Sequence, residues 1–478
     1  MHPLHNAACR RLPGRIRGAV LAAALLASAP GCGVNPVTGE RELQLVSRAA
    51  EIQIGEENYL YTRQAQGGMY KLDPALGTYV SMVGQRLAKV SDRPDLPYEF
   101  VVVNNSTPNA WALPGGKIAV NRGLLLELDN EAELAAVLGH EIVHAAARHG
   151  AKRIERGTLL QLGVVALGAA VAESRHAEHT DLVVGAAALG SQLIDSRYSR
   201  GAELEADRYG MTYMARAGYD LRAAIKLQET FVRLAEGREH SWLEGLFASH
   251  PPSPERVAAN RGTAASLPAA GRLGAEEYRA RIEPLVASRG AYGHYEKGRR
   301  ALAEGREQEA LAQAGKAIAD EPREALFYAL KGDVRLRQRR YREAIAEYDR
   351  ALARNDRFFY HYRQRGLARD RLGDRAKANA DLRRSVALLP TAAAHHLLGD
   401  HAREAGRAGE AIEHYRKAAN TRTESGRQAY RELVRLDLPR NPGTYLAVQA
   451  GAQDGRIALR IQNRSAVALS DITVQVTG

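Results

Sequence analysis

Cysteine is nearly absent from this sequence, which has only Cys9 and Cys32 among its 478 residues. Cys9 falls in an N-terminal segment that we expect to be cleaved off, so the remaining chain can form no internal disulfide. A small fold held together by disulfide bonds is therefore excluded. An exported chain of this kind must be stabilised by its hydrophobic core or by a bound metal.

Long apolar runs are also missing. The apolar stretches 19–29, 159–172 and 182–194 are each shorter than the ~20 residues that a membrane-spanning helix needs. We interpret the second and third as a buried helical hairpin, with a mobile lid or membrane-touching element as the alternative. A content of 45% hydrophobic and 26% charged residues is typical of a globular protein.

No nucleic-acid-binding motif and no basic tract accompany the formal net charge of +12. We therefore expect no nucleic-acid partner. The charge is interpreted as a general surface property that favours acidic surfaces.

The N-terminus has the pattern of a secretion signal. Arginines between Arg10 and Arg17 precede the apolar stretch 19–29, and small residues lead to Cys32. A cysteine in this place predicts lipid attachment after cleavage. Ala29 stands where such signals have leucine, and Pro30 intervenes, so ordinary cleavage with an incidental cysteine is the alternative.

A metal-binding motif, His140-Glu141-Ile142-Val143-His144, lies inside a predicted helix. Asn130 with Glu133 forms a capping-box start, and Gly150 is the expected stop. Because residues i and i+4 share a helix face, His140 and His144 can bind one metal ion. Glu141 is then expected to act as general base toward the attacking water.

A second helix, expected over 200–217, supplies the missing ligand. A catalytic zinc takes three protein ligands, and Glu203 is our choice for the third. Asp207, one turn later, is expected to orient a ligand histidine, whereas Glu205 should face solvent. A charged helix face is the alternative for this pair. His149 is expected to cap the motif helix and not to bind metal.

Strand signals precede the motif. Residues 98–103 are predicted to form a strand, and 109–121 a hairpin that turns at Pro114-Gly115-Gly116. Helices are expected over 49–64 and 74–90, and 251–275 looks like the domain exit. The first part of the chain is thus predicted to be an α+β zincin-like metallopeptidase domain.

From residue 291 the sequence repeats. Gly298, Gly332, Gly366 and Gly399 are spaced 34, 34 and 33 residues apart, and small residues recur 12 and 19 positions after each. This spacing predicts four tetratricopeptide repeats, an all-α solenoid, with a capping helix at 428–436. Strand-like stretches at 445–449, 456–462 and 472–476 predict a small β appendage.

We therefore divide the chain into five parts. They are a signal peptide (1–31), a lipoprotein lead-in (32–48), a metallopeptidase domain (49–275), a repeat domain (291–440) and a β-strand appendage (443–478).

The motif residues, with Glu203 and Asp207 in a Glu-Ala-Asp setting, resemble the zinc metallopeptidases that include CAAX prenyl proteases and bacterial membrane heat-shock proteases. The lead-in Asn-Pro-Val-Thr-Gly, the Asn-Ala-Trp-Ala-Leu-Pro-Gly-Gly hairpin and the repeats are similar to the periplasmic lipoprotein branch, the β-barrel-assembly-enhancing proteases. The resemblance covers about 33–425. It implies one zinc per chain, with Glu203 as a ligand, and a periplasmic location with a lipid anchor at Cys32 in the outer membrane.

The same resemblance implies further site residues. The stretch Asn109, Ala110 and Trp111 would be an edge strand that pairs with an extended substrate. His250 would lie near the metal, where it either stabilises the oxyanion or caps the zinc as a fourth ligand. Arg256 is a candidate substrate-binding residue. From the residues alone, a histidine before Pro251-Pro252 is more often a loop residue.

Two functions follow from these features. The first is a zinc endopeptidase that degrades misfolded or stalled envelope proteins, with the repeats recruiting substrate or the outer-membrane assembly machinery. The alternative is a chaperone or adaptor whose peptidase domain is held shut by His250.

Overall fold

The computed structural model describes residues 32–157, 197–236, 249–268, 270–453, 456–470 and 472. The predicted signal peptide, the apolar stretches 159–172 and 182–194, and most of the predicted strand 472–476 lie outside these residues. Within the described residues, every helix is too short or too polar to cross a membrane.

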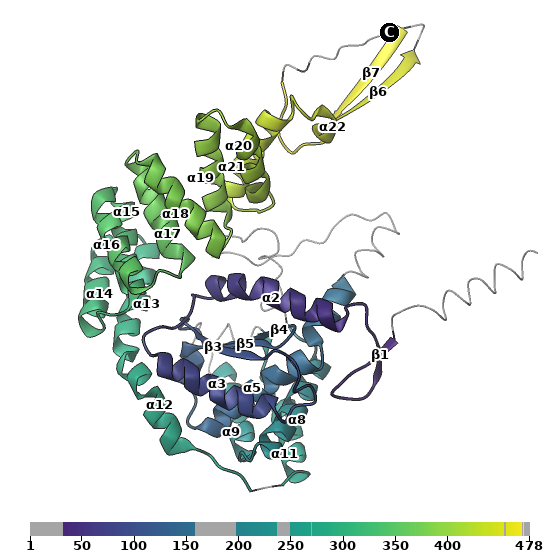
Figure 1. Cartoon of the computed structure of the whole chain (residues 1–478), viewed down its shortest axis with the longest axis vertical. Coiled ribbons are helices and arrows are strands. Elements are labelled where there is room, and N and C mark those ends of the chain that lie inside the picture. Colours follow the sequence, from purple (N-terminus) through teal and green to yellow (C-terminus); the bar gives the residue numbers. More distant parts are fainter. Residues whose placement is uncertain are drawn as a thin grey trace, which may run out of the picture.

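A three-stranded sheet forms the centre of the first domain (Figure 1). Strand β3 (Glu99–Val103) pairs in parallel with β5 (Lys117–Asn121), which pairs antiparallel with β4 (Ala110–Leu113). The order is β3-β5-β4, so β4 is at an edge. The predicted hairpin is confirmed, and its turn uses the left-handed conformation of Gly115 and Gly116.

The two faces of this sheet are covered by different helices, because successive side chains of a strand point to opposite faces. Helix α2 (Arg48–Ala65) packs Tyr59 against the face with Trp111 and Leu113. Helices α3 (Pro74–Ala88) and α5 (Glu131–Ala146) belong to the core on the other face. Strand residues on that second face are Phe100, Val102, Ala110, Ala112, Ile118 and Val120.

The motif helix α5 begins as predicted but ends earlier. Asn130 accepts a hydrogen bond from the backbone N–H of Glu133 at 2.9 Å. The predicted stop at Gly150 is wrong, because α5 ends at Ala146 and the chain turns through Arg148, whose φ is 62°. Gly150 lies in the next helical segment, where a Cβ would come within 3.1 Å of the Pro114 ring.

Helix α8 (Arg200–Arg216) packs beside α5, and its chain reverses at Gly218 with a φ of 77°. Helices α9 (Arg222–Glu236) and α11 (Pro254–Ala265) pack on this pair. The stretch 251–275, which the sequence marked as an exit, therefore supplies a helix of the domain. Helix α12 (Ala275–Ala287) then leads to the repeats.

Four helical hairpins follow, as the repeat spacing predicts. Their helices are α13 (Arg289–Ala303), α14 (Glu307–Asp320), α15 (Ala325–Arg337), α16 (Tyr341–Arg354), α17 (Phe359–Arg371), α18 (Arg375–Leu388), α19 (Ala392–Glu404) and α20 (Ala408–Ala419). The recurring glycines allow close crossing: a Cβ on Gly332 or Gly399 would come within 2.6 Å of the ring of Tyr348 or Tyr415.

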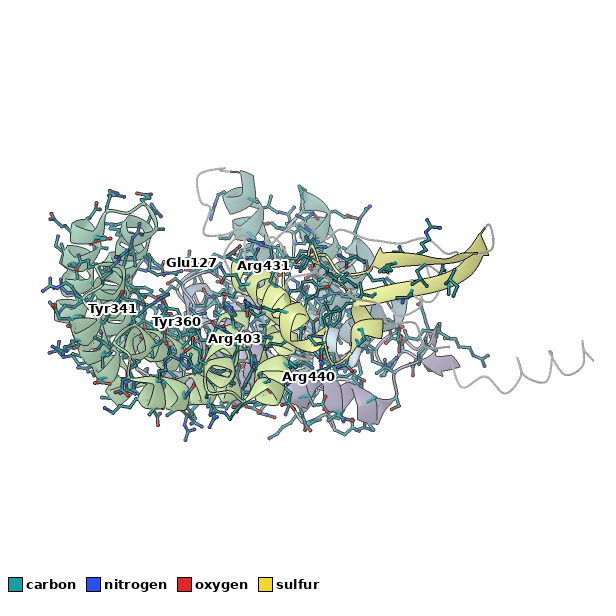
Figure 2. The ribbon with its side chains drawn as sticks, turned by 90° about the horizontal axis from the view of Figure 1, so that it is seen from above. Glu127, Tyr341, Tyr360, Arg403, Arg431 and Arg440 are labelled. Atoms are coloured by element: carbon teal, nitrogen blue, oxygen red, sulfur yellow. The ribbon has the colours of Figure 1, made fainter. Side chains whose placement is uncertain are left out.

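The C-terminal end adds three elements. Helix α21 (Glu424–Asp437) caps the repeats, and α22 (Pro442–Tyr445) leads to a hairpin of β6 (Leu446–Gln453) and β7 (Arg456–Asn463). In the view from above, the repeat helices with Tyr341 and Tyr360 lie at one end of the molecule (Figure 2). The helix with Arg403 and the capping helix with Arg431 lie nearer this hairpin.

Polar contacts join the repeats to the loop that leads into β4. Asn104 donates to Glu324 at 3.1 Å and accepts from Arg122 at 2.8 Å. The Arg122 guanidinium lies 3.2 Å from the centre of the Tyr292 ring. Ser106 donates to Glu296 at 2.7 Å. The entry to the edge strand is therefore bonded to the first repeat and to the start of the second.

Candidate metal and active site

Four side chains converge between α5, α8 and the start of α11. They are His140, His144, Glu203 and His250, whose potential ligand atoms all lie within 4.8 Å of one another, and all four are buried. The first three are the ligands predicted from the sequence. The Nε2 atoms of His140 and His144 lie 3.0 Å apart, as i, i+4 spacing on α5 allows.

The hydrogen bonds of the two motif histidines favour a cation between them. Nδ1 of His140 lies 2.9 Å from a carboxylate oxygen of Asp207, so this nitrogen carries the proton and Nε2 has a lone pair. Nδ1 of His144 lies 2.8 Å from Nδ1 of His149. If His144 donates there, two lone pairs face each other at 3.0 Å. Such a pair needs either a proton or a metal cation between its atoms, and the donor set of two imidazoles and a carboxylate suits zinc.

The pKa shifts of the buried residues also favour a cation at this position. Burial alone would lower the pKa of His140, but the carboxylates of Glu203 and Asp207 raise it to about 10. Burial would raise the pKa of Asp207, but Arg256 lowers it and keeps the carboxylate ionised. The site therefore stabilises positive charge at the position where the ligand atoms converge.

Arg256 supports two acidic residues at once. Its guanidinium donates to both oxygens of Asp207 at 2.7 Å each and lies 3.0 Å from Glu203. Only 4% of Arg256 is exposed. The Arg256 guanidinium therefore pairs with Asp207 and Glu203 beside the candidate metal ligands. The substrate-binding role predicted for Arg256 stays a prediction.

Glu141 and His250 lie on the open side of the ligand cluster. One Glu141 oxygen is 3.5 Å from Nε2 of His250, and the other, also buried, has no partner among the described residues. Burial raises the pKa of Glu141, as suits a general base. His250 lies in the bend before α11, as expected for a residue that precedes two prolines. Its Nδ1 is 3.0 Å from Glu203 and 3.2 Å from His140, so this loop histidine belongs to the cluster.

Two residues given minor roles by the sequence form a support for His144. His149 contacts His144 through Nδ1, and its Nε2 lies 3.4 Å from Glu205. Glu205 also accepts from Asn35 at 3.4 Å. The prediction that Glu205 faces solvent is therefore wrong. The order of donors, from His144 to His149 to Glu205, leaves Nε2 of His144 free for a metal.

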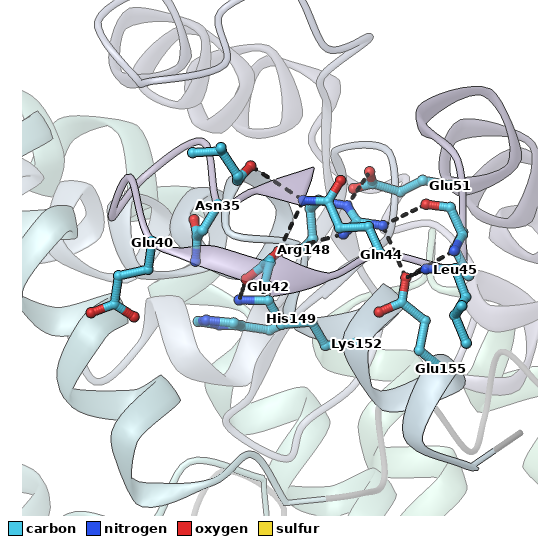
Figure 3. A network of polar contacts seen from close by, with 12 residues as sticks. Asn35, Glu40, Glu42, Gln44, Leu45, Glu51, Arg148, His149, Lys152 and Glu155 are labelled. Atoms are coloured by element: carbon cyan, nitrogen blue, oxygen red, sulfur yellow. Dashed lines mark hydrogen bonds and ion pairs between the residues drawn. The ribbon is translucent and has the colours of Figure 1, made fainter. Parts of the chain in front are cut away.

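The lead-in segment is docked onto this support (Figure 3). Strands β1 (Cys32–Val34) and β2 (Arg41–Leu43) form a small hairpin. Arg148, at the end of the motif helix, donates to Glu155 at 3.1 Å and to the backbone carbonyl of Val46 at 2.5 Å. The left-handed backbone of Arg148 lets its side chain contact Val46 at the end of the lead-in. The residue pattern alone did not predict this contact.

Replacing His149 by phenylalanine is expected to weaken zinc binding by roughly 10–100-fold, because His144 loses the acceptor that orients it. His149→Gln, whose amide can both accept and donate, should recover most of the affinity. Competition with a chromophoric chelator measures both. Equal affinity for the phenylalanine variant and the intact chain would show that His149 does not position His144.

Tyr198 was not identified from the sequence. Its ring stacks on His144 with centroids 3.8 Å apart, and the Arg153 guanidinium lies 4.2 Å from its centre. Tyr198 stands two residues before α8, where no motif marks it. Only the tertiary arrangement could reveal this contact.

The predicted substrate strand has the required placement. One edge of β4 pairs with β5, and β4 has no second neighbour in the described sheet. Ala110 faces the α5 side, whereas Trp111 is buried on the α2 side, where its ring lies 6.4 Å from that of Tyr59. Asn109 accepts from the backbone of Ala110 at 3.0 Å. Pairing with substrate stays a prediction.

This fold and ligand cluster define a metallopeptidase domain of the His-Glu-x-x-His class. Residues 74–264 match the family described as Peptidase family M48. The ligand cluster and Glu141 just described lie within this matched stretch.

The curated relatives that resemble the chain include the following two, each with more than 30% identity. A protein of Vibrio cholerae named putative beta-barrel assembly-enhancing protease is 32% identical over 216 residues, which are 41% of this chain and 40% of that protein. The mitochondrial metalloendopeptidase OMA1 of Schizosaccharomyces pombe is 34% identical over 224 residues, 46% of this chain and 63% of that one. The chain thus spans less than two thirds of either relative.

Among solved structures, the crystal structure of MamA is similar to part of this chain. The alignment covers 33% of this chain and 90% of the MamA chain, at 19% identity and a TM-score of 0.26. The assignment of the repeats rests on their helices and spacing.

Proposed function

We propose that the chain is a zinc-dependent endopeptidase that cleaves misfolded or stalled proteins of the bacterial envelope. The convergence of His140, His144 and Glu203 beside the buried Glu141 carries this proposal. A periplasmic location with a lipid anchor at Cys32 fits the N-terminal pattern, and the name of the Vibrio cholerae relative fits an envelope substrate.

One zinc ion would be held by His140, His144 and Glu203, with His140 oriented by Asp207 and His144 by His149. Bound zinc supplies Lewis acidity toward the scissile carbonyl and the attacking water. Arg256 balances the charge of Asp207 and Glu203, so both carboxylates can stay ionised although they are buried.

An extended peptide would pair with the edge of β4 that faces away from β5, where main-chain groups of the strand offer hydrogen bonds independent of substrate sequence. The Ala110 N–H would then exchange its bond to the Asn109 side chain for one to the peptide. Glu141 then takes a proton from the attacking water and passes it to the nitrogen of the leaving amine. Its unpartnered oxygen is the group available for this transfer.

The repeats would recruit substrate or the outer-membrane assembly machinery. Their contacts with Asn104 and Ser106, just before β4, support this role, because the repeats then lie close to the proposed substrate strand. This proximity suits delivery of an unfolded segment to β4 and the ligand cluster.

The test uses purified full-length protein. We expect one zinc per chain by elemental analysis, and cleavage of casein that stops on chelation and returns with zinc. Undiminished cleavage by metal-free protein would refute the proposal, and a serine-protease inhibitor serves as control for contaminating peptidases.

A chaperone or adaptor role is the second candidate, and the position of His250 favours it. Its Nδ1 lies among the ligand atoms, 3.2 Å from Nε2 of His140, where it could take the position that the attacking water needs. On this alternative, a Glu141→Gln chain would complement a strain that lacks the protein, whereas a chain without its repeats would not. Failure of that complementation would favour proteolysis.

A further inference from the structure

A hollow opens beside the metal ligands, bounded by α5, α8, α9 and α11, and reaches β4 at Ala110. Glu141 and His250 line its inner end. It holds about 560 Å³ of empty space, including the part open to solvent. Its walls are mostly apolar, built by Leu124 of α4 (Arg122–Leu125) and by Val137, Met211, Met214, Leu227 and Phe231.

Two amide side chains interrupt this apolar lining. Gln228 of α9 and Asn260 of α11 both line the hollow and are only 7% and 2% exposed. The amide oxygen of each is buried and lacks a hydrogen-bond partner among the described residues. An unsatisfied buried polar group destabilises a fold, so a ligand that supplies the missing hydrogen bond is favoured. Both groups are therefore available to a ligand.

The hollow lies where a substrate side chain would enter. Successive side chains of a strand point to opposite faces, and Ala110 and Ala112 point to the α5 face of the sheet. A peptide paired along the edge of β4 would direct alternate side chains to this same face. With the scissile bond beside Glu141, a neighbouring side chain enters the hollow.

We propose that this hollow is a specificity pocket for tyrosine next to the scissile bond, a proposal that rests on the peptidase function above. The ring would pack against Met211, Met214 and Phe231, and the hydroxyl would reach Gln228 and Asn260. A hydroxyl both donates and accepts, so it can pair with either amide. Phenylalanine would leave the amides unpaired, and the Arg256 guanidinium at the wall disfavours lysine or arginine.

The experiment compares peptides of one sequence, taken from a cleavage site mapped in casein by mass spectrometry. The residue on each side of the scissile bond is varied in turn among Tyr, Phe, Leu and Gln. We expect kcat/KM for tyrosine to exceed that for phenylalanine at least tenfold on one side of the bond. In Gln228→Met and Asn260→Leu chains, the ratio should fall toward one or invert.

Gln53→Met, an exposed glutamine on α2, is the matched control and should keep the ratio. Equal rates for tyrosine and phenylalanine, or an unchanged ratio in both pocket variants, would overturn the assignment. Binding of the same peptides to a Glu141→Gln chain, followed by fluorescence anisotropy, separates the two proposals. A tyrosine preference in binding without cleavage by the intact chain would refute the peptidase function and retain the pocket.

Discussion

Glu141→Gln is expected to lower the rate of peptide cleavage by roughly 10²–10⁴-fold, the usual contribution of a general base. The amide has the size of the carboxylate but cannot take a proton from the attacking water. Because Glu141 is not among the clustered ligand atoms, zinc content should stay at one per chain. Single-turnover cleavage of a fluorogenic peptide, with elemental analysis of the same sample, measures both.

Glu229→Gln provides the control for that variant, since this glutamate is exposed and pairs only with Arg261 in the described contacts. We expect its rate to equal that of the intact chain. A Glu141→Gln protein that keeps its zinc and cleaves at the normal rate would exclude Glu141 as the base.

Arg256→Ala should cause the largest loss of stability among single substitutions near the site. It leaves Asp207 and Glu203 buried without their cation, and breaking a buried ion pair typically destabilises a protein by about 3–5 kcal/mol. In a domain of this size, that corresponds to a fall in Tm on the order of 10 °C. Calorimetry should find a larger fall without zinc, since bound zinc neutralises Glu203.

Arg261→Ala tests whether position alone explains such an effect. Arg261 is on the same helix, but its ion pair with Glu229 is exposed, so its loss should change stability by less than about 1 kcal/mol. Equal losses of unfolding free energy in the two variants would show that the buried ion pairs of Arg256 stabilise the fold no more than the exposed pair of Arg261.

Local patterns predicted the parts of the site that lie within single helices. His140 and His144 are fixed by i, i+4 spacing on α5, and Asn130 marks the start of that helix. Glu203 and Asp207 share a face of α8 in the same way. Chemistry that depends on short sequence separation can therefore be predicted from the residues alone.

Contacts between distant segments could not be predicted in this way. His149 and Glu205 carry no motif, and their link to His144 depends on how α8 packs beside α5. The end of α5 was misjudged because Gly150 is a usual stop, whereas tertiary contacts hold Arg148 in a left-handed turn. The contact of Arg256 with Asp207 likewise depends on the packing of α11 against α8, which the local sequence does not show.

The docked lead-in has a consequence for the order of folding. Asn35 and Glu205 are 170 residues apart, and Leu45 and Glu155 are 110 apart. Contacts between such distant residues close long loops and therefore form late. The support of His144 is completed only after α8 has packed against α5, so a partly synthesised chain has the motif but not the finished centre. The candidate metal centre is therefore complete only once α8 is in place, because α8 supplies both Glu203 and the Glu205 that supports His149.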